Sequence, residues 1–118
     1  MKTDEVKRNG VVTRVAGDVA ILDILGDLTA QTREEVEAAY QHATESGAKK
    51  LLLTFTKDAY INSGGIAIII NVAIAGRKHG QKIRIVEPSE HFQKIFAMVG
   101  LKQYVEIYAS ESEALSGF

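Results

Sequence analysis

Residues 49–70 read KKLLLTFTKDAYINSGGIAIII, and this stretch joins two apolar runs through a turn that contains a serine and two glycines. The first run, KKLLLTF, is short and almost continuously apolar, which is typical of a central strand covered on both faces. The second run follows the glycines and is long enough to form a helix. A buried strand that leads into a helix is the unit from which α/β domains are built, so this stretch predicts the fold class.

A hairpin is expected before this stretch. Two β-rich runs, Val11–Ala16 and Val19–Leu25, are separated only by Gly17-Asp18. A two-residue connection that begins with glycine between such runs is typical of a β-hairpin, whose strands pair antiparallel. Residues 1–10 precede the hairpin, and we expect them to form an edge segment or to be poorly ordered.

A helix is expected between the hairpin and the central strand. Its apolar residues recur at helical spacing while its glutamates lie on other faces, and Gly47 is expected to end it. Thr32 with Glu35 fits a capping box at the start of this helix, and Thr29 is an alternative start. The predicted buried stripe consists of Val36, Ala39, Tyr40 and Ala43.

Helices and strands continue to alternate after the central stretch. The helix behind the glycines is expected to reach Lys78 and to end at Gly80, and the strand KIRIVE stops at Pro88. Ser89 is placed to cap a third helix, YVEIY reads as a last strand, and ESEAL reads as a final helical turn or two. The predicted buried stripe of the third helix consists of Phe92, Ile95, Phe96 and Val99.

The order of the expected elements is β-β-α-β-α-β-α-β-α, within one domain of residues 1–118. Strands that alternate with helices of this length pair in parallel, and the opening hairpin adds one antiparallel edge. The sequence therefore predicts a single α/β domain with a small mixed sheet and four helices.

The composition argues against several classes of function. The chain carries 14 lysine and arginine residues against 15 aspartate and glutamate residues, so it shows no basic footprint for nucleic acid or for an anionic membrane. It has no cysteine, which excludes disulfides and thiolate metal sites. The apolar run from Ile66 to Ala75 is about half of the roughly 20 residues that a spanning helix requires. We therefore expect no membrane insertion and a cytoplasmic location.

No catalytic or cofactor-binding motif stands out, and we expect a protein that is not an enzyme and holds no metal or cofactor. A serine hydrolase with Ser63 as nucleophile would need a glycine two residues before the serine, and that position is Ile61. No nucleotide-binding glycine loop is present. The histidines at positions 42, 79 and 91 are isolated in sequence and show no metal-ligand spacing.

Ser63 has two interpretations. A serine or asparagine before a helix accepts hydrogen bonds from unpaired backbone N–H groups, and either Asn62 or Ser63 can serve as this cap. In the second interpretation, Ser63 is presented at the end of a docking helix. Helical spacing places Ile66, Ile69, Val72 and Ala73 against the sheet, and Ala67, Asn71 and Lys78 opposite, with Ile68, Ile70 and Ile74 beside them.

The outward side of this helix carries small and apolar residues where a surface helix normally carries charge. Burial under a neighbouring element is one explanation, and a docking face for a partner is the one that we favour. Phosphorylation of Ser63 would add roughly −1.5 to −2 charge beside that face. A desolvation penalty of about 3 kcal/mol would weaken binding on the order of a hundredfold while the domain stays folded.

The segment INSGGIAIIINVAIAGRKHGQKIRIVEPSEHFQKIFAMVGLKQYVEIY resembles a STAS domain, the family of sulfate transporter and anti-sigma factor antagonist domains. The resemblance runs from about Val11 to Leu115. Its most specific parts are Ser63-Gly64 entering a helix that ends at Gly80, the Pro88-Ser89 junction, and VGL followed by a strand and SESEAL. The resemblance implies one mixed sheet with helices mainly on one side.

In the anti-sigma factor antagonists of this family, a serine at the start of the second helix is phosphorylated by the anti-sigma factor, which is a serine kinase, and a phosphatase reverses this. Ser63 matches that position as the phosphoacceptor, and this chain has Ile61 and Asn62 where phosphorylated members usually carry an aspartate. The resemblance implies a partner surface of Asn62, Gly64, Gly65, Ala67, Ile70, Asn71 and Ile74. The alternative is a STAS subunit that is not phosphorylated and binds constitutively to a transporter ATPase or a larger signalling assembly.

Overall fold

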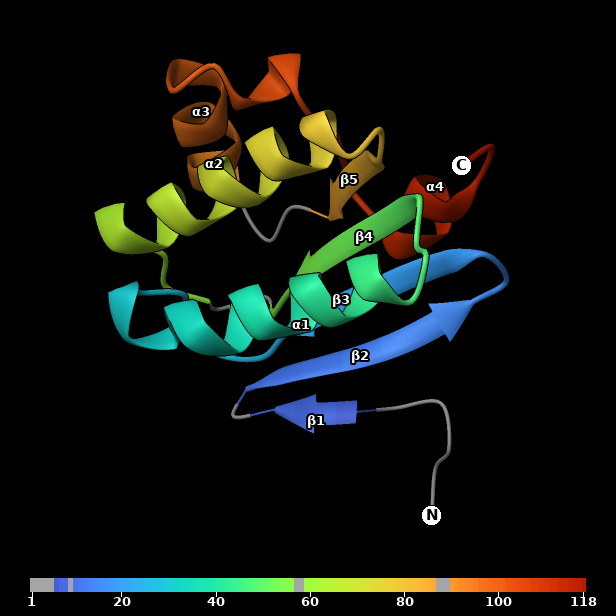
Figure 1. Cartoon of the computed structure of the whole chain (residues 1–118). Coiled ribbons are helices and arrows are strands. Elements are labelled where there is room, and N and C mark those ends of the chain that lie inside the picture. The colour runs from blue at the N-terminus through green and yellow to red at the C-terminus, as the bar shows by residue number, and fades with distance from the viewer. Residues whose placement is uncertain (1–5, 9, 57–58, 87–89) are drawn as a thin grey trace.

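The computed structural model describes residues 6–8, 10–56, 59–86 and 90–118 (Figure 1). The strands are β1 (Val6–Arg8), β2 (Val11–Ala16), β3 (Val19–Ile24), β4 (Lys50–Phe55), β5 (Lys82–Val86) and β6 (Glu106–Tyr108). The helices are α1 (Arg33–Glu45), α2 (Ser63–Lys78), α3 (Glu90–Met98) and α4 (Glu111–Leu115), with the 3₁₀ helices η1 (Ala30–Thr32) and η2 (Leu101–Gln103). The predicted order of elements is confirmed, and β1 is an additional strand at its beginning.

The described strands join one sheet in the order β1-β2-β3-β4-β5-β6. The pairs β1–β2 and β2–β3 are antiparallel, and the pairs from β3 to β6 are parallel, which confirms the predicted mixed sheet. Ala16 pairs with Val19, so Gly17 and Asp18 form the predicted two-residue connection of the hairpin. Gly17 has a φ of 63°, which glycine adopts without strain.

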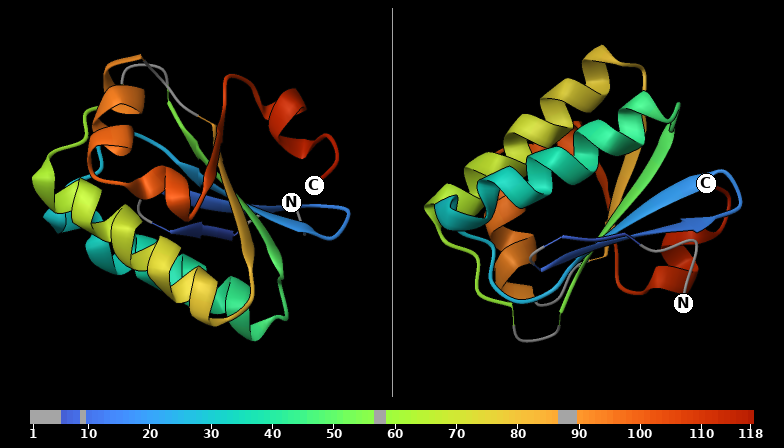
Figure 2. Two further views of the ribbon diagram at one scale, coloured as in Figure 1. Left: turned by 90° about the horizontal axis from the view of Figure 1, so that it is seen from above. Right: turned by 60° about the horizontal axis from the view of Figure 1, so that its bottom comes forward.

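Helices α1, α2 and α3 cover one face of the sheet, and α4 lies on the other (Figure 2). The main core lies between the sheet and the three helices, and includes Leu22, Leu51, Leu53, Ile85 and Phe96. A smaller cluster between the sheet and α4 consists of Val19, Ile21, Leu52 and Ala114. Successive leucines of β4 alternate between the two clusters, which explains why this strand is apolar on both faces.

The chain before α1 uses the second of the two predicted starts. The Thr29 hydroxyl accepts a hydrogen bond from the backbone N–H of Gln31 (3.2 Å), and the Thr29 N–H donates to the Thr32 hydroxyl (3.0 Å). These bonds cap η1, and Thr32 makes no side-chain cap for α1. The predicted capping box of Thr32 and Glu35 is therefore wrong. The predicted buried stripe of α1 is confirmed at Val36, Ala39, Tyr40 and Ala43.

Two predictions near the C-terminus are corrected. The last strand is shorter than YVEIY, because residues 101–103 form η2 and pairing with β5 begins only at Glu106. Val99, predicted in the buried stripe of α3, is 45% exposed because it follows the last residue of that helix. Phe92 and Phe96 are buried as predicted. The predicted junction at Pro88 and Ser89 lies outside the described residues.

Candidate functional site

Asn62 caps helix α2. Its backbone is extended, with φ −97° and ψ −175°, and its side-chain oxygen Oδ1 accepts a hydrogen bond from the backbone N–H of Gly65 (2.9 Å). This is the geometry in which a cap satisfies one of the unpaired N–H groups of the first turn. Ser63 is therefore the first residue of the helix and is not needed as its cap.

The Ser63 side chain is available to other molecules. The residue is exposed, and its hydroxyl forms no hydrogen bond with any residue that the structure describes. A nucleophilic serine needs a base within hydrogen-bonding reach, and no histidine or carboxylate of the described chain is bonded to Ser63. The site can present the Ser63 hydroxyl to a partner.

The loop that carries Ser63 is held by the segment that follows β3. The backbone N–H of Leu28 donates to the carbonyl oxygen of Tyr60 (2.8 Å), and the N–H of Asn62 donates to the carbonyl oxygen of Leu28 (3.3 Å). Leu28 and Ile61 form a parallel bridge, and both side chains are buried. These contacts fix where α2 begins relative to the sheet, and so they fix the position of Ser63.

The two glycines after Ser63 allow close packing. A Cβ on Gly65 would lie 2.1 Å from the carbonyl oxygen of Leu28, and a Cβ on Gly64 would lie 3.0 Å from the Cβ and the backbone nitrogen of Ala30. Gly65 is buried and Gly64 is half-buried. Gly65, predicted as a partner-binding residue, is therefore a packing residue that lies beneath the surface, because the loop around Leu28 covers it.

The outward face of α2 is largely apolar. Ala67 and Ile70 are half-buried, and Asn71 and Ile74 are exposed, with Ile74 at 37%. Ile68, predicted near this face, is fully buried, since the sheet and the neighbouring elements cover more of the helix than a single stripe. Charged residues appear on this helix only in its last turn, at Arg77 and Lys78. Asn62, Ser63, Gly64, Ala67, Ile70, Asn71 and Ile74 form the surface that we call the α2 face.

Two exposed apolar residues lie outside the surface predicted from the sequence. Tyr60 is 57% exposed three residues before Ser63, and its backbone N–H donates to Oδ1 of Asp27 (3.1 Å). Leu25 directly follows β3 and is 43% exposed. An aromatic residue in a loop beside a glycine-rich turn is a signal by which Tyr60 is recognisable from the sequence.

The described residues contain no group of three or more histidine, cysteine, aspartate or glutamate side chains that could hold a metal ion. His42 lies on α1 and His79 follows α2, so these two rings come from different elements. None of the described helices has both the length and the apolar character needed to cross a bilayer.

Solved structures of similar shape come from several bacteria. The Thermotoga maritima protein TM1081 has a TM-score of 0.76 at 23% identity, over 87% of this chain and 89% of its own. SpoIIAA from Bacillus, described as an anti-sigma factor antagonist in its unphosphorylated form, has a TM-score of 0.70 at 18% identity, over 89% of this chain and 92% of its own. SpoIIAA has also been solved in its phosphorylated form.

An anti-sigma factor antagonist from Mycobacterium paratuberculosis has a TM-score of 0.72 at 16% identity, over 90% of each chain. At these identities the similarity establishes the fold. No curated protein matches the sequence. The family described as the STAS domain matches residues 10–114, which is nearly the whole chain and includes all of the α2 face. The chain belongs to the STAS domain family.

Proposed function

We propose that this protein is an anti-sigma factor antagonist, a non-enzymatic cytoplasmic module that binds an anti-sigma factor and is switched off by phosphorylation of Ser63. The observation that carries the proposal is the position of Ser63, which is exposed and has no hydrogen-bond partner in the described structure, at the start of an apolar helix face. The names of two similar structures support the same class of function, and one of them is known in both phosphorylation states.

The geometry suits a switch that leaves the fold intact. A phosphate on Ser63 would lie at the N-terminal end of α2, where the helix dipole favours negative charge. Asn62 caps the helix through a neutral amide, so the phosphate would meet no carboxylate from the cap. A partner packed on the α2 face would have to desolvate the phosphate, and binding would weaken while the domain stays folded.

The partner chemistry follows from this arrangement. The anti-sigma factor would itself be the serine kinase, so that one protein both binds the α2 face and modifies Ser63. A serine phosphatase would restore the binding form. Tyr60, which is exposed three residues before Ser63, extends the apolar contact that such a partner would bury.

Replacing Ser63 by aspartate is expected to weaken partner binding by about tenfold or more, and phosphorylation of Ser63 by about a hundredfold. The free energy of unfolding should not fall, because an acidic residue in the first helical turn is favourable. The measurement is affinity capture from the source lysate, identification of a kinase-fold protein, and calorimetric titration of that protein with both forms. Ser63→Ala is the control and should bind as the wild type does. Equal affinity of the wild type and Ser63→Asp would refute the switch.

The alternative function is a STAS subunit that binds a transporter ATPase or a larger signalling assembly constitutively. It is favoured by Ile61 and Asn62, which stand where phosphorylated members of the family usually carry an aspartate. In this case the apolar residues of the α2 face carry the function, and Ser63 substitutions leave binding unchanged.

Replacing Ile74 by aspartate is expected to weaken binding of either kind of partner by about thirtyfold, because a charge would be buried in an apolar contact. Ile74 is 37% exposed, so the domain should stay folded. Met98→Asp is the matched control, since Met98 is 84% exposed on a different helix. Binding that survives Ile74→Asp would place the partner surface elsewhere.

A further inference from the structure

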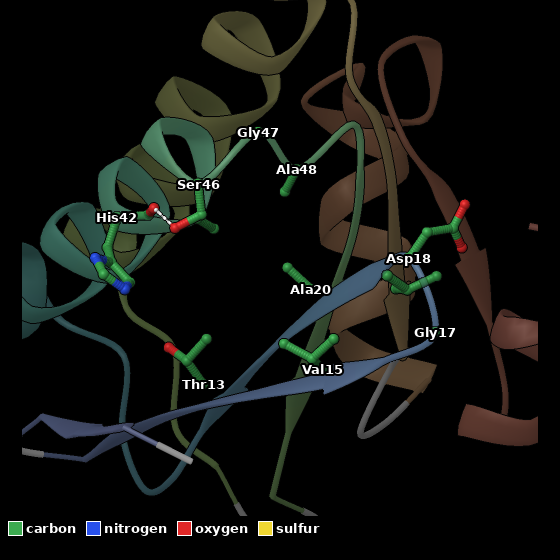
Figure 3. A pocket seen from close by; sticks show the side chains of 11 residues that line it. Thr13, Val15, Gly17, Asp18, Ala20, His42, Ser46, Gly47 and Ala48 are labelled. Carbon is green, nitrogen blue, oxygen red and sulfur yellow. Dashed lines mark hydrogen bonds between the residues drawn. The ribbon is translucent and has the colours of Figure 1, made fainter. Parts of the chain in front are cut away.

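A recess lies at the end of α1 that is remote from the Ser63 loop. It has a volume of about 420 Å³ and lies between the β2–β3 hairpin and the residues that end α1 (Figure 3). No residue of the α2 face lines it. Its apolar wall is built from small or short side chains, which leave the space open: Val15, Gly17, Val19, Ala20, Ala43, Gly47 and Ala48. We call this space the hairpin recess.

Thr13 is a buried polar residue of this recess. It is only 8% exposed, and its hydroxyl forms no hydrogen bond with any residue that the structure describes. Buried polar groups are normally paired with protein groups or with ordered water, so a hydroxyl without a protein partner can bond a molecule that enters the recess. The Thr13 hydroxyl lies on the side that faces His42 across the recess (Figure 3). Among the described residues the Thr13 hydroxyl therefore has no partner, and it lies where a bound molecule can reach it.

The other polar side chains at the recess, apart from His42, are already engaged. The Ser46 hydroxyl donates to the backbone carbonyl oxygen of His42 (2.9 Å). The Asp18 carboxylate accepts a hydrogen bond from Lys50 (2.8 Å), which lowers the pKa of Asp18. The exposed His42 ring forms no hydrogen bond within the described chain. The free groups are thus the Thr13 hydroxyl and the His42 imidazole, and both can donate.

We propose that the hairpin recess binds a small apolar molecule that carries a hydrogen-bond acceptor, such as a carboxylate or an amide carbonyl. The apolar part lies against Val15, Ala20 and Ala48, and the acceptor oxygen lies between Thr13 and His42. The volume falls within the range of about 300 to 1,000 Å³ that small-molecule sites occupy. This site is independent of the proposed function, because it shares no residue with the α2 face.

A titration of the full chain with hexanoate, followed by ¹⁵N–¹H NMR, tests this inference. We expect saturable shifts of the backbone amides of Thr13, Ala20 and Ala43. Thr13→Val keeps the shape of the side chain and removes the hydroxyl, so it should weaken hexanoate binding by about tenfold without lowering the unfolding midpoint. Ala48→Leu should fill the recess and abolish binding.

Ala38→Leu is the control, since Ala38 lies on α1 and does not line the recess. It should bind hexanoate as the wild type does. The inference is overturned if hexanoate produces no saturable shift at the recess. It is equally overturned if the wild type and Thr13→Val bind hexanoate with the same affinity.

Discussion

Replacing Gly65 by alanine is expected to lower the free energy of unfolding by about 3 kcal/mol. The new Cβ would lie 2.1 Å from the carbonyl oxygen of Leu28, and a backbone atom cannot rotate away as a flexible side chain can. The loop around Leu28 must therefore shift, and it carries the hydrogen bonds to Tyr60 and Asn62 that position the start of α2. The loss of stability is measured by urea unfolding, and NMR of the Ser63 amide reports the displaced loop.

Gly76→Ala is the matched control for this substitution. Gly76 is also buried in α2, but its Cβ would meet the Cδ1 atom of Ile83, at 2.4 Å, which is the end of a flexible side chain. Alanine also favours a helix over glycine by about 1 kcal/mol. Gly76→Ala should therefore change the free energy of unfolding by no more than about 1 kcal/mol. Similar losses for the two variants would show that the Leu28 backbone does not limit the packing at Gly65.

Replacing Arg84 by methionine is expected to lower the free energy of unfolding by about 3 kcal/mol and to release the C-terminal segment. Arg84 lies in β5 and is only 6% exposed. Its Nη1 atom donates to the carbonyl oxygens of Ala114 and Ser116, both at 3.0 Å. Methionine has a similar length but no donor, so these carbonyl groups would be left without their partner.

The aromatic residues around Arg84 also help to hold the C-terminal segment against β5. The Arg84 Cζ atom lies 4.4 Å from the ring centroid of Phe118 and 5.0 Å from that of Tyr108, within the range of cation–π contacts. In Arg84→Met, hydrogen exchange should be faster at residues 111–117 than in the wild type. The amides of β4 should lose protection only to the extent that the free energy of global unfolding falls. Protection at residues 111–117 equal to that of the wild type would show that α4 is held by its apolar contacts alone.

Glu106→Gln separates the ion pair from the carbonyl contacts. Arg84 Nε donates to Glu106 Oε1 at 2.8 Å, but the Glu106 side chain is 58% exposed. Exposed ion pairs contribute little, so Glu106→Gln should lower the free energy of unfolding by less than about 1 kcal/mol. A loss as large as that of Arg84→Met would make the ion pair, rather than the carbonyl contacts, the main anchor.

The hydrophobic pattern was sufficient to predict the order of strands and helices. The reason is that apolar residues recur along the sequence with the period of the strand or helix whose face they bury. The leucines of β4 are apolar on both faces since α1–α3 cover one side and α4 the other. The stripe of α1 is apolar at helical spacing because only one side of that helix meets the sheet. The ends of elements were predicted less well. Either Thr29 or Thr32 could cap the start of the helical segment. The choice depends on the path of the chain before α1, which a local sequence pattern does not reveal.

The sequence by itself placed Ser63 at the start of a helix with an apolar outer side. It did not determine which of Asn62 and Ser63 caps that helix, because both residue types satisfy unpaired N–H groups equally well. The choice follows from the hydrogen bonds between Leu28 and the loop before Ser63, which join residues more than 30 positions apart. The same contacts bury Gly65.

The packing of distant segments also decided which polar residues are buried. In the sequence, Arg84 is a polar residue between two apolar residues of a strand. It holds the C-terminal segment only because the residues of that segment fold back over it and accept its hydrogen bonds. Thr13 reads as an ordinary strand residue, and only the tertiary structure shows that it lines a recess opposite the end of α1, where its hydroxyl bonds to none of the described residues. Local patterns specify the elements of this protein, because each element must bury its own apolar side. Tertiary contacts specify its sites, because those sites are made by residues that no local pattern connects.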